Sequence, residues 1–136
     1  MPQRRTDGLL IVGLKNPLDS SPEAALEPFT PNGAGERLWK MVDAVRPIEK
    51  VAYFDKIDFV NIASNVDRVK KMVLMDRRRA VVLGREAWSL LGLESKVNFF
   101  TRRGSAYLIP HPSGRTLSYN SAKTRRRAGM LIAGLM

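Results

Sequence analysis

Short apolar runs alternate along this chain with segments whose apolar residues recur at helical spacing. The runs at 8–14 and 80–84 are apolar at nearly every position, which is typical of strands buried on both faces of a parallel sheet. Four further β-leaning segments are predicted as strands: 51–54, 59–62, 97–100 and 106–109.

Helical spacing predicts four helices, and a long loop separates the first of them from the first strand. Pro47 ends the first helix and Gly92 closes the third. The loop at 15–35 holds about twenty residues, a length typical of functional or disordered segments. A polar turn is predicted at 110–117, and the helices are predicted at 36–46, 66–78, 86–91 and 119–135.

This order of strands and helices predicts a single α/β domain over residues 1–136. We expect a three-layer α/β/α arrangement, with helices on both sides of a mostly parallel central sheet of about four strands. In such sheets the functional residues gather beyond the carboxyl ends of the strands. Here those loops begin at Lys15, near Asn61, at Arg85 and at Pro110.

Charge favours a nucleic-acid partner. Lys and Arg number 23 against 13 Asp and Glu, which gives a formal net charge of +10. Such a surplus destabilises the compact state, but it speeds encounters with polyanions and neutralises phosphates. Basic residues cluster at 77–79, where we expect a solvated face, and at 123–127, which opens the last predicted helix. A basic protein that binds a protein or an RNA particle is an alternative.

Composition also excludes several kinds of site. There is no cysteine and only one histidine, which excludes disulfides, Cys-based zinc sites and His-rich metal sites. We expect no metal and no cofactor. No Gly-x-x-x-x-Gly-Lys phosphate loop is present. The first residues precede no apolar segment of signal-peptide length, and no stretch approaches the roughly 18 apolar residues of a membrane span. We therefore expect a monomer without membrane contact, in the cytoplasm of a bacterium or a phage-infected cell.

Three polar segments follow predicted strands and carry the candidate chemistry. In the first, residues 13–19, Asn16 and Asp19 offer an amide and a carboxylate that would orient or deprotonate a water molecule, although an ordinary turn has the same composition. In the second, Asn61 interrupts an apolar strand. Its side chain suits the edge of a nucleobase, but a helix cap or a core position also accounts for it.

The third segment holds the only histidine of the chain in a proline-flanked loop. His111 lies between Pro110 and Pro112, directly after a predicted strand. A neutral imidazole there would donate a hydrogen bond to developing negative charge. A purely structural histidine is the alternative.

Together and in order, these segments resemble the uracil-DNA glycosylase superfamily, closest to its mismatch-specific and single-strand-selective branches. The sequence Gly-Leu-Lys-Asn-Pro at 13–17 resembles the water-activating motif of the family, and His-Pro-Ser at 111–113 matches its histidine motif. Phe29 and Asn61 fall where the family keeps a base-stacking ring and a base-reading Asn. Gly-Glu-Arg-Leu-Trp-Lys-Met-Val at 35–42 and Val-Val-Leu-Gly-Arg at 81–85 resemble further segments of the same fold.

The resemblance implies a DNA glycosylase that extrudes uracil, or a modified or mismatched pyrimidine, and hydrolyses its N-glycosidic bond without a metal. Phe29 would stack on the base, Asn61 would bind its edge, and Asn16 with Asp19 would position the attacking water. His111 would stabilise the departing base. The implied DNA contacts are Lys15, Ser113, Gly114, Arg115, Arg125, Arg126 and Arg127.

Two features depart from the family pattern. Lys15 stands as an extra residue between Gly13 and Asn16, and the chain is shorter than most members. An extra residue at this point would displace the water-activating side chain. The departures favour an alternative: a catalytically inactive DNA-binding protein on the same fold, encoded by a phage or another mobile element.

Overall fold

The computed structural model describes residues 8–14, 26–94, 96–112 and 117–136. Five strands form one sheet in the order β2-β1-β3-β5-β4. The first four of these run parallel, and β4 pairs antiparallel with β5 at the edge. The strands are β1 (Leu9–Gly13), β2 (Ile57–Asn61), β3 (Ala80–Leu83), β4 (Arg102–Arg103) and β5 (Ala106–Ile109).

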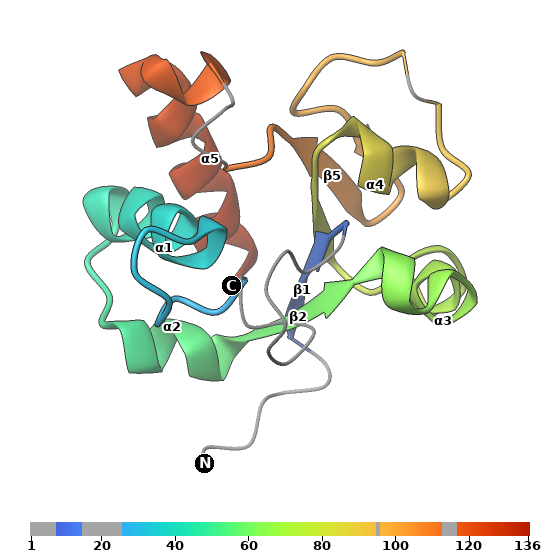
Figure 1. Ribbon diagram of the computed structural model, residues 1–136, viewed down its shortest axis with the longest axis horizontal. Coiled ribbons are helices and arrows are strands. Elements are labelled where there is room, and N and C mark those ends of the chain that lie inside the picture. The colour runs from blue at the N-terminus through green and yellow to red at the C-terminus, as the bar shows by residue number, and fades with distance from the viewer. Residues whose placement is uncertain (1–7, 15–25, 95, 113–116) are drawn as a thin grey trace.

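Helices lie on both faces of this sheet (Figure 1). One face is covered by α1 (Ala34–Val45), α2 (Lys50–Lys56) and α5 (Ala122–Leu135). The other is covered by α3 (Val66–Lys70), its π-helical continuation Lys71–Met75, and α4 (Arg85–Leu90). No helix in the described ranges is both long and apolar enough to cross a membrane.

Strand β1 divides its side chains between two cores. Leu9 and Ile11 pack into the core beneath α1, α2 and α5, whereas Leu10 and Val12 pack into the core beneath α3 and α4. All four side chains have no solvent exposure. This double burial explains the continuous apolar run, and it confirms the predicted α/β class and the mostly parallel sheet. The sheet has five strands rather than about four, because the antiparallel edge strand β4 is added.

The prediction of a strand at 51–54 is wrong. These residues lie in α2, where the backbone N–H of Tyr53 donates to the carbonyl of Glu49 at 2.9 Å. The neighbouring rings of Tyr53 and Phe54 are both buried, and the Phe54 ring stacks on Phe59 of β2 with centroids 6.1 Å apart. A short apolar run fits a buried helix as well as a strand, and here tertiary packing decides between them.

The predicted strand at 97–100 is also absent, and the segment runs irregularly beside β5. Phe100 has a left-handed φ of 70°, which breaks an extended conformation. Its N–H donates to the carbonyl of Leu108 at 2.6 Å, and the N–H of Leu108 donates to Thr101 at 3.0 Å. The residues that pair with β5 as a strand lie further along the chain than predicted, in β4.

The predicted solvated face at 77–79 holds only in part, because Arg78 is a structural residue. Its guanidinium pairs with the Asp58 carboxylate, with 3.1 Å between Nη1 and Oδ2, and its Nε donates to the carbonyl of Gly8 at 3.0 Å. The Arg78 side chain is only 10% exposed. It ties the amino-terminal ends of β1 and β2 together, while Arg77 and Arg79 are exposed.

Helices α1 and α5 pack closely through a glycine. A Cβ atom on Gly129 of α5 would overlap the backbone carbonyl of Met41 in α1. Gly134 lies in the same helix, and a Cβ there would meet no atom within 4 Å. The absence of a side chain at Gly129 therefore sets the approach of the two helices.

We expect Gly129→Ala to lower the free energy of unfolding by roughly 1–3 kcal/mol or more, because the added methyl forces α5 away from α1. Gly134→Ala is the matched control. It should leave stability unchanged or raise it by up to about 1 kcal/mol through helix propensity. Urea unfolding followed by circular dichroism measures both, and equal stability of the two variants would contradict this packing.

Candidate nucleic-acid-binding site

The carboxyl ends of the four parallel strands bring separate polar segments to one edge of the sheet. Gly13 ends β1 in register with Asn61 at the end of β2. Gly84 follows β3, and its N–H donates to the carbonyl of Ile109 at the end of β5. The residues along this edge are therefore, in strand order, Asn61, Gly13, Gly84 and the Pro110-His111 pair.

This edge also holds the point where the direction of chain winding reverses. From β1 the chain passes through α1 and α2 to β2, and from β3 it passes through α4 to β5 on the opposite side. In open α/β sheets ligands bind in the crevice between two such strands, outside their carboxyl ends. The loops that the sequence analysis singled out at Asn61, Arg85 and Pro110 therefore lie at this edge of the sheet, and their functional role stays a prediction.

Asn61 is buried at this edge, with 2% of its surface exposed, and lies against Gly13. A Cβ on Gly13 would lie 2.6 Å from Oδ1 of Asn61 and 3.1 Å from both terminal methyl groups of Leu26. The Asn61 side chain makes no hydrogen bond that caps the short 3₁₀ helix after it. The cap of α3 is Asn65, whose Oδ1 accepts from the N–H of Arg68 at 3.2 Å. The capping alternative for Asn61 is therefore wrong, whereas its burial agrees with the alternative of a core position.

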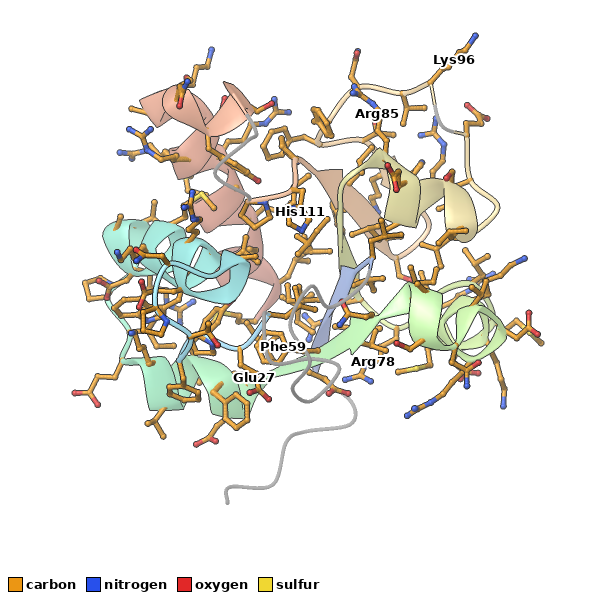
Figure 2. The ribbon with its side chains drawn as sticks, in the orientation of Figure 1. Glu27, Phe59, Arg78, Arg85, Lys96 and His111 are labelled. Atoms are coloured by element: carbon orange, nitrogen blue, oxygen red, sulfur yellow. The ribbon has the colours of Figure 1, made fainter. Side chains whose placement is uncertain are left out.

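His111 is half-buried directly after β5. The hydroxyl of Tyr119, in the 3₁₀ helix Leu117–Asn120, donates to the carbonyl of Pro110 at 2.6 Å on the carboxyl side of the strand. Gly84 adopts a φ of 91°, and a Cβ there would meet the Cβ of His111 at 3.5 Å. Burial lowers the pKa of His111 below its ordinary value, so the imidazole is neutral at neutral pH. Figure 2 shows His111 between α5 and the strands.

Phe29 lies on the same face of the sheet as Asn61 but contacts α2. Its ring packs edge-on against Phe54, with centroids 5.4 Å apart, and 47% of its surface is exposed. Phe54 in turn stacks on Phe59, which precedes Asn61 by two residues and points to the same face. Phe29 therefore reaches β2 through an intervening aromatic ring.

The basic residues of α5 that were predicted to contact DNA lie in two different environments. Arg125 and Arg126 line a cavity beside α1. The guanidinium carbon of Arg127 lies 4.2 Å from the centre of the Phe100 ring. All three are exposed on the first turns of the helix, which Ser121 caps by accepting from the N–H of Thr124 at 3.4 Å.

Arg85 forms a second arginine–aromatic pair, which the sequence analysis did not assign to the site. Its guanidinium carbon lies 4.0 Å from the centre of the Phe99 ring, and its Nε donates to the carbonyl of Val97 at 3.2 Å. Figure 2 shows Arg85 toward the end of the sheet opposite Arg78. In the sequence, the feature that could have identified Arg85 is its position directly after a glycine that follows a buried strand.

Several predicted site residues lie outside the described ranges: Lys15, Asn16, Asp19, Ser113, Gly114 and Arg115. Their roles remain predictions. Within the described part of the chain, no three His, Cys, Asp or Glu side chains are grouped to hold a metal ion. The structure thus brings Asn61 and His111 to one sheet edge and places Phe29 at the side of α2.

Comparison with protein-family models, curated proteins and solved structures finds no match to this chain. The candidate site therefore rests on its own geometry.

The pKa of His111 in the folded chain is expected below 6.5, because burial penalises the imidazolium form. Protonation then favours the unfolded chain. The contribution of His111 to the free energy of unfolding falls as pH drops below about 6.5, and this contribution levels off beneath the folded pKa. Since the chain has one histidine, an NMR titration of its Cε1–H resonance reports this value directly. The urea-unfolded chain is the reference, and an equal or higher pKa in the folded protein would contradict burial of the imidazole.

Proposed function

We propose that this protein binds DNA at the carboxyl edge of its sheet, accepts an extruded base beside Asn61 and hydrolyses the N-glycosidic bond of that base. One observation carries the proposal: Asn61 is buried against Gly13 at the same sheet edge as the half-buried, neutral His111. These are the residues to which the glycosylase resemblance assigns base recognition and stabilisation of the departing base.

Recognition of the base follows from the chemistry of an amide at this position. An Asn side chain presents a donor and an acceptor side by side, which complements the edge of a nucleobase. Burial excludes competing water, so a base that leaves these groups unpaired is rejected more strongly. The base reaches the site after extrusion from its stack, which costs least for a mismatched, damaged or single-stranded base.

The bond-breaking step requires charge stabilisation on the base. Water attacks C1′ of the sugar, the C1′–N bond breaks, and its electron pair goes to the departing base. His111, held neutral by burial, donates a hydrogen bond to the oxygen on which this charge develops. The proton lost by the water passes to solvent or to a carboxylate, for which the sequence offers Asp19.

The arginine–aromatic pairs supply the phosphate contacts. Arg85 over Phe99 and Arg127 over Phe100 each place a guanidinium on an aromatic ring. A stacked guanidinium keeps its N–H groups at the edge of the plane, where they bind phosphate oxygens. Both pairs come from segments adjoining the carboxyl ends of β3 and β5, so they suit a strand that runs past His111.

A second candidate is DNA binding without cleavage on the same site. Lys15 favours it, since an extra residue after Gly13 shifts Asn16 from the position that activates water in the family. The positive net charge and the proposed recognition of a base fit a glycosylase and a non-cleaving DNA-binding protein equally well.

A base-release assay separates the two candidates. The protein is incubated with single- and double-stranded oligonucleotides carrying uracil, hydroxymethyluracil, hypoxanthine or a mismatched thymine, and alkali then breaks abasic sites. We expect scission on at least one substrate, and a loss of about 10²-fold or more in rate for His111→Ala with DNA affinity retained. Scission that is unchanged in His111→Ala would exclude the proposed role of this residue.

Asn61→Asp tests base recognition, because it keeps the shape and exchanges the amide donor for an acceptor. It should slow release of the preferred base, with circular dichroism confirming that the variant folds. Asn98→Asp, on an exposed loop residue, makes the same change of charge and should leave release unchanged. Binding without scission on any substrate would select the inactive DNA-binding protein.

A further inference from the structure

A cavity of about 570 Å³ opens between α1 and α5, beside the loop that carries His111. Its volume lies within the range of small-molecule sites, roughly 300–1,000 Å³. Two helices and the loop after β5 supply its walls. Among the described residues they contribute Arg37, Lys40, Met41, Ala44, Val45, Pro112, Tyr119, Ala122, Arg125 and Arg126.

The charged residues that the structure describes at this cavity all have the same sign. Four of its described lining residues are cations, two from each helix, and none is acidic. Lys40 pairs with Glu36 at 3.6 Å, but its side chain is 63% exposed, so solvent screens that pair. Glu36 itself is held more closely by Lys50, at 2.9 Å. The electrostatic balance of the cavity therefore favours an anion.

The other described lining residues are mainly apolar. Met41, Ala44 and Val45 contribute aliphatic surface from α1, and Pro112 contributes its ring. The hydroxyl of Tyr119 is already engaged with the Pro110 carbonyl, so this residue presents ring carbon to the cavity. A hydrated inorganic anion gains little from such walls, whereas a ligand with an apolar body buries surface on them.

We propose that this cavity binds a small organic anion, an apolar body that carries a phosphate, sulfonate or carboxylate group. The cations of α1 and α5 hold the charged group, and the apolar residues between them hold the body. A nucleotide and an aromatic carboxylate share this chemistry. The proposal does not rest on the glycosylase function, since its measurement involves no DNA and no base release.

Isothermal titration calorimetry with 1-anilinonaphthalene-8-sulfonate tests the site. We expect saturable binding at one site per chain. Ala44→Trp fills the cavity from an exposed position on α1 and should abolish binding. Arg37→Gln/Arg126→Gln removes one cation from each helix and should weaken binding by about tenfold or more, since hydrogen bonds to charged groups contribute most strongly.

The matched control is Arg68→Gln/Lys123→Gln. It removes the same amount of charge from exposed residues that do not line the cavity, and it should change affinity by less than about twofold at moderate ionic strength. Circular dichroism verifies that every variant folds. Absence of saturable binding, or equal affinity in the native chain and the Ala44→Trp variant, would overturn the proposal.

Competition identifies the source of the ligand. Displacement of the probe by deoxyuridine monophosphate but not by naphthoate assigns the cavity to nucleotides, and the reverse assigns it to aromatic carboxylates. Either result supports an organic-anion site. Displacement by inorganic phosphate as effectively as by both organic anions would contradict the role given to the apolar walls.

Discussion

Parallel pairing of β1 with a strand on each side is the constraint on which the rest of the structure depends. Because β2 and β3 both run parallel to β1, and β5 continues the same direction, four strands end at one edge. The connections between them must cross the faces of the sheet, which places helices on both sides and buries β1 completely. The same geometry brings Asn61, Gly13, Gly84 and His111 together, although nearly 100 residues separate Gly13 from His111 in the sequence.

The features that sequence could predict are those set by local pattern. Continuous apolar runs identified β1 and β3, because strands buried on both faces have no polar position to alternate with. Helical spacing and Pro47 identified α1. The prediction that polar residues after parallel strands lie along one edge needed only the strand direction, and it anticipated that Asn61 and His111 follow strands ending at the same edge of the sheet. Gly13 gave a weaker signal: the structure explains it by the amide of Asn61, which occupies the space of a Cβ.

The features that sequence could not predict depend on contacts between distant segments. Tyr53 and Phe54 form part of a helix because Phe59 and Phe29 supply aromatic partners for their rings. Arg78 is largely withdrawn from solvent because Asp58, twenty residues earlier, pairs with it at the amino ends of the strands. The stacking of Arg85 and Arg127 on aromatic rings, and the cavity between α1 and α5, exist only once the two faces are assembled. Contacts between residues that are distant in the sequence produce no periodic pattern of hydrophobic and polar positions.

The most direct test of the central account is a titration of ¹⁵N-labelled protein with a short single-stranded oligonucleotide, followed by NMR. Nucleic acid that binds across the carboxyl edge is expected to cause the largest amide shift changes at Gly13, Asn61, Gly84, Arg85 and His111. The amino-terminal end of the sheet, marked by Arg77 to Arg79, should change little despite its positive charge. The largest changes at Arg77 to Arg79, with the carboxyl edge unaffected, would contradict the account and place the nucleic acid at the opposite end of the molecule.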